Sequence, residues 1–120
     1  MELYSTKHIS PNVGLEEALF RGLPPDNGLY VPITIPTLPK AFFENIELLS
    51  FPEIAFEVTK ALLGDALEEG EIKKITSEAI NFDAPMVKVE ENLYSLELFH
   101  GPSLAFKDFG ARFMARLMSF

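Results

Sequence analysis

Hydrophobic residues recur at helical spacing in several stretches of the chain, and boundary signals mark where these stretches begin and end. The first stretch covers about residues 13–21 and is followed by Gly22, a residue type favoured just beyond a helix C-terminus. The second starts at Ser50, which has Glu53 three residues later, the spacing of a capping box, and it runs to Gly64. These patterns predict two helices.

A third helix is predicted from about Glu71 to Ile80, with an inward face formed by Ile72, Ile75 and Ala79. Extended structure is predicted on either side of it. Residues 29–31 read as a short strand, and residues 86–89 and 93–96 read as two strands joined by Glu90, Glu91 and Asn92.

The last pattern predicts a helix from about Leu104 to the end of the chain. Its apolar residues fall at spacings of three, four, four and three, which places them on one helix face: Phe106, Phe109, Phe113, Leu117 and Phe120. The pattern stops without a terminating residue, so the chain is expected to be a fragment of a longer protein. We expect this face to be exposed in the fragment and to support self-association.

Composition narrows the classes of function. The chain has 120 residues, 48% of them hydrophobic, which suits one folded domain. A net charge of -8 disfavours binding to nucleic acid and to anionic membranes. The absence of cysteine excludes disulfides and thiolate chemistry, and the acidic cluster at residues 68–71 lacks calcium-loop spacing, so no metal site is predicted. With no secretory signal and no apolar run of membrane-spanning length, a cytoplasmic protein is expected.

Lys107 is the residue to which a chemical role can be given. A lysine that attacks an aldehyde must be neutral, whereas its ordinary pKa is about 10.4. Desolvation by Phe106 and the positive end of a helix dipole would both lower this pKa. The small residues Gly110 and Ala111, one turn later, would leave room for a flat cofactor. Helix physics alone, however, makes a lysine at a helix start a solvated surface residue in most cases.

Its neighbours allow alternatives. Asp108 is expected to favour the helix N-terminus and to pair with Arg112. Ser103 either contacts a cofactor or substrate or caps the last helix. His100 either orients a substrate or acts as a base, or it holds the loop by hydrogen bonding, and the second reading is preferred. Ser5 and Thr6 are read as a turn, and His8 as exposed and without a partner.

Two segments carry a resemblance to a known family. Residues 97–110, Glu-Leu-Phe-His-Gly-Pro-Ser-Leu-Ala-Phe-Lys-Asp-Phe-Gly, resemble the cofactor-lysine motif of threonine synthases and the wider attachment pattern of serine/threonine dehydratases. Residues 4–6 and 22–32 are similar to the N-terminal domain of threonine synthases. That family commonly has two glycines at the place of Asn27-Gly28, and Asn tolerates a positive φ.

The resemblance implies an α/β fold, that of the tryptophan-synthase-like enzymes that use pyridoxal 5'-phosphate, with the fragment itself mixed α+β. It implies an N-terminal domain at residues 1–80 and the start of the catalytic domain at residues 81–120. Lys107 would carry pyridoxal 5'-phosphate as a Schiff base, and Ser103, at a position where the family has Thr or Ser, would contact the cofactor.

The implied reaction is that of a lyase acting on carbon–oxygen bonds in threonine biosynthesis. It converts the small molecule O-phospho-L-homoserine and water into L-threonine and phosphate. The groups that bind the cofactor phosphate and the pyridine nitrogen are expected beyond this chain, so the piece alone is expected to be inactive. The alternatives are a serine/threonine dehydratase, a group that generally lacks the upstream segment, and a non-enzymatic interaction domain derived from the family.

Overall fold

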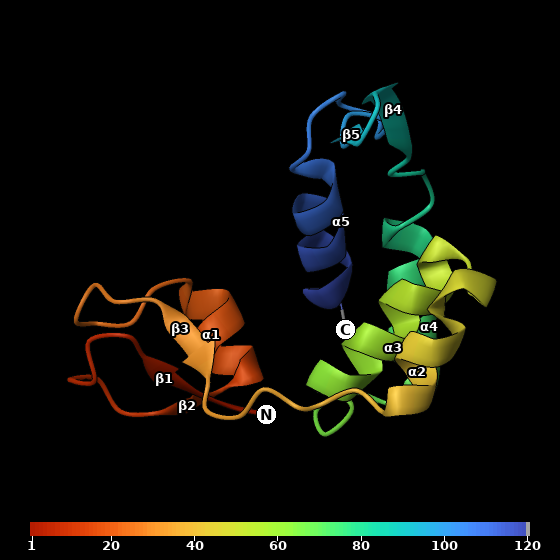
Figure 1. Ribbon diagram of the computed structural model, residues 1–120. Helices are drawn as coiled ribbons and strands as arrows, with labels where there is room; N and C mark the ends of the chain where they lie inside the picture. The colour runs from red at the N-terminus through yellow and green to blue at the C-terminus, as the bar shows by residue number, and fades with distance from the viewer. Residues whose placement is uncertain (120) are drawn as a thin grey trace.

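The computed structural model describes residues 1–119, and its first part is a small unit at residues 1–32, here called the N-terminal unit (Figure 1). Strands β1 (Glu2–Ser5), β2 (Val13–Gly14) and β3 (Tyr30–Pro32) form an antiparallel sheet in the order β2-β1-β3. Helix α1 (Leu15–Arg21) follows β2 directly. The unit has its own core, formed by Leu3, Val13 and Ala18.

In this unit, the end of the helix and the following turn were predicted better than the strands. Gly22 ends α1 with a φ of 76°, and Asn27 takes a φ of 59°, as its tolerance of the left-handed region allows. Strand β3 was predicted, whereas β1 and β2 were missed. With four and two residues, they are too short to show an alternating pattern.

An extended segment at residues 33–39, bounded by Pro32 and Pro39, leads to a group of helices (Figure 1). These are α2 (Lys40–Asn45), the 3-10 turn η1 (Ile46–Leu48), α3 (Phe51–Leu63) and α4 (Glu69–Ala79). Helix α2 and η1 were not predicted.

Capping boxes determine where α3 and α4 begin. The Ser50–Glu53 box is present, and the Glu53 carboxylate accepts the Ser50 N–H at 2.7 Å. Helix α4 begins two residues earlier than predicted because Glu68 and Glu71 form a second box. The predicted inward residues Ile72, Ile75 and Ala79 are fully buried.

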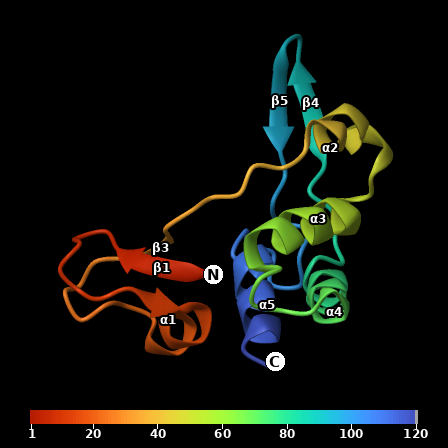
Figure 2. The same cartoon turned by 90° about the horizontal axis from the view of Figure 1, so that it is seen from below.

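Strands β4 (Met86–Glu90) and β5 (Leu93–Leu96) form the predicted hairpin, which projects from the helices in both views (Figures 1 and 2). Every residue of the two strands is exposed. The connection turns at Asn92, whose φ is 61°, and the register shifts between Lys88 and Glu90.

The last helix, α5, spans Asp108–Leu117 and lies beside α4 (Figure 2). The prediction that it begins at Leu104 is wrong, because Leu104 has a φ of 56° and residues 101–107 form turns. Phe106 consequently lies outside the helix and is 72% exposed.

The apolar face of α5 is also less exposed than predicted. Phe109 contacts the rings of Phe51 and Phe82, and Phe113 and Leu117 are partly buried. The large apolar residues that are exposed here are Met114 on the helix and the adjacent Met118. The predicted contribution of Phe120 lies outside the described residues.

The molecule is elongated, with principal extents of 48 × 28 × 28 Å. Its radius of gyration is 16.4 Å, whereas a compact domain of this length would have about 13.6 Å. The predicted mixture of helices and strands is confirmed. In the part of the chain that the structure describes, no helix is long and apolar enough to cross a membrane.

Candidate cofactor-attachment site

Lys107 is the residue immediately before α5 and occupies the N-cap position of that helix. Its backbone carbonyl accepts a hydrogen bond from Ala111 N at 2.8 Å. Its side chain is exposed, and within residues 1–119 its amine makes no hydrogen bond or ion pair. Lys107 therefore stands at the positive end of the α5 dipole, as predicted.

The predicted desolvation of Lys107 by Phe106 is not found. Both side chains are exposed, and the neighbouring Leu104 is 76% exposed. Beyond Lys107 the backbone of Gly110 is open, since a side-chain carbon added there would meet no atom within 4 Å. In the described part of the chain, Lys107 and Gly110 are thus both exposed positions.

A closed loop precedes Lys107 and is held by the side chain of Asp108. One carboxylate oxygen of Asp108, Oδ2, accepts the Ser103 N–H at 2.8 Å, and the other, Oδ1, accepts the Ser103 hydroxyl at 2.7 Å. Two backbone hydrogen bonds also hold the loop. Leu104 N donates to Gly101 O at 3.0 Å, and Asp108 N donates to Ala105 O at 3.1 Å. We call this arrangement the Ser103–Asp108 latch.

The latch requires a glycine at residue 101. Gly101 is buried, and a side-chain carbon there would stand 2.5 Å from Asp108 Oδ2 and 2.7 Å from its Cβ. Asp108 itself is only 7% exposed. The hydrogen bonds from the Ser103 hydroxyl and backbone lower the pKa of the Asp108 carboxyl, against the opposing effect of burial, with smaller contributions from the charges of Arg112 and Lys107.

The roles predicted from sequence for Ser103 and Asp108 match the structure only in part. Ser103 does not cap α5, because the N-cap is Lys107 and no side chain caps that end. Its alternative role, contact with a cofactor, stays a prediction. Asp108 does stand in the first turn of α5, but it forms no ion pair with Arg112.

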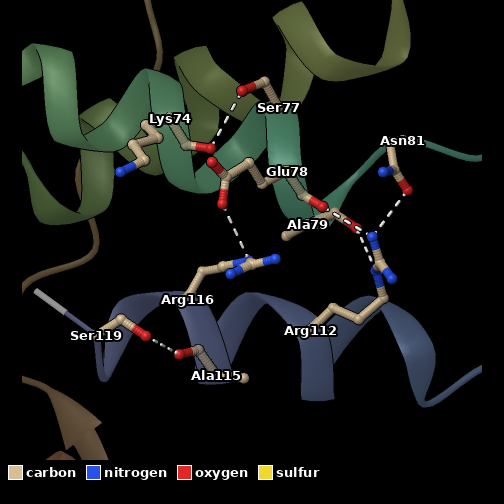
Figure 3. A network of polar contacts seen from close by, with 9 residues as sticks. All are labelled: Lys74, Ser77, Glu78, Ala79, Asn81, Arg112, Ala115, Arg116 and Ser119. Atoms are coloured by element: carbon tan, nitrogen blue, oxygen red, sulfur yellow. Dashed lines mark hydrogen bonds and ion pairs between the residues drawn. The ribbon is translucent and has the colours of Figure 1, made fainter.

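Arg112 reaches the end of α4 instead (Figure 3). Its guanidinium donates from Nε to Ala79 O at 3.1 Å and from Nη2 to Glu78 O at 2.8 Å and Asn81 Oδ1 at 2.9 Å. A cation at this place satisfies carbonyls that a helix C-terminus leaves without partners and complements the helix dipole. One turn later, Arg116 Nε pairs with Glu78 Oε2 at 3.1 Å. These contacts tie α5, and hence the residue before it, to α4.

His100 lies at the start of the same loop and is held by its neighbours. Its Nε2 lies 2.7 Å from Glu97 Oε2, and its ring stacks on Phe99 with centroids 4.7 Å apart. A hydrogen-bonding role was preferred from sequence, and the partner found is Glu97 and not the Gly101-Pro102 loop. A role toward substrate stays a prediction. The other histidine, His8, is exposed as predicted, but the prediction that it lacks a partner is wrong, because its ring stacks on Tyr4 with centroids 4.8 Å apart.

The upstream motif is organised around Asp26, which sequence reasoning assigned only to a turn. Asp26 Oδ1 accepts the Ser5 hydroxyl at 2.7 Å and Gly28 N at 2.9 Å, and Oδ2 accepts Ser10 N at 2.9 Å. Thr6 Oγ1 accepts Leu29 N at 3.0 Å. Ser5 and Thr6 are therefore structural partners of residues 26–29, which the reading as a simple turn did not predict. The sequence feature that could have indicated this contact is the presence of short polar side chains in both segments, Ser5 and Thr6 in one and Asp26 in the other.

Apolar cavities occur elsewhere in the described part of the chain. One of about 540 Å³ lies between α1, the turn after α3 and the end of α5, and one of about 720 Å³ lies between α3, residues 83–85 and Phe109. Neither is lined by Lys107 or Ser103. Within residues 1–119, no group of acidic or histidine side chains has the arrangement of a metal site.

Known proteins share both the sequence and the fold of this chain. The family model described as "Threonine synthase N terminus" matches residues 2–80. The threonine synthase of Haemophilus influenzae is 44% identical over 122 residues, which cover 99% of this chain and 28% of that protein. The threonine synthase of Schizosaccharomyces pombe is 38% identical, covering 97% of this chain and 24% of that protein.

Solved structures agree. The crystal structure of threonine synthase from Escherichia coli superposes with a TM-score of 0.92 at 34% identity, covering 99% of this chain and 28% of that one. The structure of PLP-bound threonine synthase from Brucella melitensis gives a TM-score of 0.90 at 33% identity, covering 98% and 26%.

These matches define the chain as the N-terminal part of an α/β biosynthetic enzyme fold. The chain belongs to the threonine synthase family. It spans only 24–28% of the length of these relatives.

Proposed function

We propose that this chain is part of a complete protein that is a threonine synthase. That protein would convert O-phospho-L-homoserine and water into L-threonine and phosphate, using pyridoxal 5'-phosphate attached to Lys107. When bound, this cofactor supplies an electron sink for carbanions. The observation that carries the proposal is a lysine whose amine is free and exposed, on a chain related to threonine synthases from end to end.

The residues around Lys107 fit such a group. The amine has no competing hydrogen bond or ion pair within residues 1–119, and Gly110 has no side chain that would obstruct a group approaching it. One of the related structures is described as PLP-bound. Lys107 would hold the cofactor covalently and would accept or donate a proton at its Nζ once substrate had displaced it.

For Ser103 we keep the proposal of cofactor contact in a restricted form. Its hydroxyl proton is committed to Asp108 Oδ1, so only the lone pairs of its oxygen remain. While the latch is closed, Ser103 could therefore accept a hydrogen bond from a bound group and could not donate one to an anion.

The 120 residues alone would be inactive, since we place the groups that bind the cofactor phosphate and the pyridine nitrogen in other parts of the complete protein. We also propose a domain boundary near residue 80, with residues 81–120 opening the catalytic domain. A cytoplasmic location is proposed from the biosynthetic role of the family, without nucleic-acid or membrane partners, and cell fractionation would test it.

The experiment is to treat the complete protein with pyridoxal 5'-phosphate, reduce it with borohydride and map the labelled peptide. We expect the label on Lys107 and a visible absorbance band that is lost in Lys107→Ala. Formation of threonine and phosphate from O-phospho-L-homoserine should be lost in the same variant.

Lys88→Ala serves as a matched control, because Lys88 is also exposed but lies on the hairpin. It should keep both the label and the activity. A label found on Lys60 or Lys88 would refute the assignment of Lys107. Deamination of serine or threonine in place of threonine formation would point to a dehydratase.

A further inference from the structure

We propose that the Ser103–Asp108 latch is a positioning device for Lys107, with Asp108 and Ser103 acting through the backbone and not by touching the reacting atoms. The inference rests on the proposed function, since it concerns the lysine that would hold the cofactor. It assigns roles to Asp108 and Gly101 that their sequence context did not indicate.

The first argument is the place of the latch in the chain. Asp108 is covalently next to Lys107, and its carboxylate binds the backbone and the side chain of the same residue, Ser103. The four residues between Ser103 and Asp108 cannot spread apart while both hydrogen bonds hold. The Cα of Lys107 is the last position inside this closed loop, so its place is fixed by the loop on one side and by α5 on the other.

The second argument is burial. An aspartate that is only 7% exposed at the start of a helix must have its charge satisfied, and the two Ser103 donors do this together with the helix dipole. The glycine at residue 101 is needed for the same reason, because any side chain there would displace Asp108. Leu104, held at a φ of 56°, shows that the loop keeps a conformation that non-glycine residues rarely adopt.

The third argument is the freedom of the lysine itself. The carboxylate of Asp108 faces Ser103, and the amine of Lys107 has no partner within residues 1–119. The latch thus holds the Lys107 backbone without binding its amine, which an ion pair with Asp108 would have done. A positioned but unpaired amine is what covalent attachment of a carbonyl compound requires.

The test compares Ser103→Ala, Ser103→Thr and Asp108→Asn with the wild type. Ser77→Ala is the control, since the Ser77 hydroxyl also donates one hydrogen bond, in this case to the backbone carbonyl of Lys74, but lies on α4 (Figure 3). One readout is amide hydrogen exchange in the 120-residue chain. We expect faster exchange at Leu104 and Asp108 in Ser103→Ala and Asp108→Asn, and wild-type exchange in Ser103→Thr and Ser77→Ala.

The second readout is the complete protein. Small displacements of a reacting group can cost about 10²-fold in rate. Ser103→Ala should therefore lower kcat by about 10- to 100-fold with KM nearly unchanged, and should slow borohydride-trapped attachment of pyridoxal 5'-phosphate at Lys107. Ser103→Thr, which keeps the hydroxyl, should restore both.

The outcomes separate the possibilities. Faster exchange with unchanged kcat would make the latch merely structural and overturn the proposal. A lower kcat with wild-type exchange would mean that Ser103 affects the reaction only through its own contact with cofactor or substrate and not by positioning the backbone, which also overturns it. A wild-type protein that neither labels Lys107 nor forms threonine refutes the proposed function, and the latch as a catalytic device with it.

Discussion

Two aspartates, Asp26 and Asp108, organise the two motifs of this chain in the same way. Each carboxylate accepts hydrogen bonds from a serine hydroxyl and from backbone N–H groups of a loop. Each also has a glycine beside it: a side-chain carbon added at Gly101 would collide with Asp108 itself, and one added at Gly28 would collide with Ser5 Oγ, the partner of Asp26. A short anionic side chain can satisfy several converging donors at once, which explains why each loop combines Asp, Ser and Gly.

Asp26 makes the N-terminal unit sensitive to acid. Partial burial raises the pKa of this carboxyl, but hydrogen bonds from Ser5, Gly28 and Ser10 outweigh it and leave the pKa well below its ordinary value. The unfolded chain therefore binds the proton more readily than the folded one. The stabilisation is complete above the unfolded pKa of about 3.9 and is lost as pH falls below it.

We expect the amides of Ser10 and Gly28 to lose exchange protection as the pH falls from about 5 to about 2. Asp26→Asn should remove most of this pH dependence and should already expose both amides at neutral pH, since an amide nitrogen would face N–H donors. Nuclear magnetic resonance of the 120-residue chain measures both amides directly. Equal protection in wild type and variant at neutral pH would contradict the role given to Asp26.

At the scale of elements, signals local in sequence predicted the structure best. The Ser50–Glu53 box, the Gly22 end of α1 and the hairpin at residues 86–96 were all predicted, because each depends on residues a few positions apart. The start of α5 was not, because helical periodicity continues through residues 104–107 while the latch holds those residues in turns.

In the candidate site, too, features that depend on neighbouring residues were predicted, and features that depend on distant residues were not. Lys107 could be singled out from its motif, whereas its open surroundings could not, since they depend on where Phe106 points. The contact of Arg112 with α4 joins residues more than thirty positions apart. No local sequence pattern indicates this contact, and the spacing of Asp108 and Arg112 favoured a pair between those two residues instead.

The contact of Arg112 with α4 should matter more to stability than that of its neighbour Arg116. Arg112 donates three hydrogen bonds around the α4 terminus, partly shielded from water, whereas Arg116 forms one ion pair with both side chains well exposed. Arg112→Ala should reduce the free energy of unfolding by about 1.5–3 kcal/mol. Arg116→Ala should cost at most about 1 kcal/mol.

Denaturant unfolding of the two variants, with hydrogen exchange along α5, measures the difference. The exchange should rise along α5 in Arg112→Ala and leave the N-terminal unit unchanged. Similar losses for both variants would mean that apolar packing of α5, and not the contact with the α4 carbonyls, holds the two helices together.

At the scale of the whole molecule, much apolar surface faces outward. On the hairpin alone, six large apolar residues are exposed: Met86, Val87, Val89, Leu93, Tyr94 and Leu96. An isolated two-stranded hairpin is marginally stable in water, and large apolar patches attract other apolar surfaces. The surface expected from sequence on α5 is thus found mainly elsewhere.

We predict that the isolated chain binds a hydrophobic dye and self-associates, and that the hairpin contributes more to both than α5. Val89→Thr with Leu96→Thr removes apolar surface while keeping strand-forming residues, and should reduce dye fluorescence and light scattering. Met114→Gln with Met118→Gln on α5 is the matched pair and should have the smaller effect. The reverse order would restore α5 as the associating surface.

The extended segment at residues 33–39 has a consequence for how this chain melts. It is the covalent bridge between the core around Leu3 and Val13 and the core around Ile72 and Ile75, and within residues 1–119 no elements of the two parts pack extensively on each other. Prolines such as Pro36 stiffen such a bridge without making it adhere to either side. A change in the stability of one core should therefore have little effect on the stability of the other. The chain should behave as two cooperative units with separate transitions, so that a single melting temperature would describe neither.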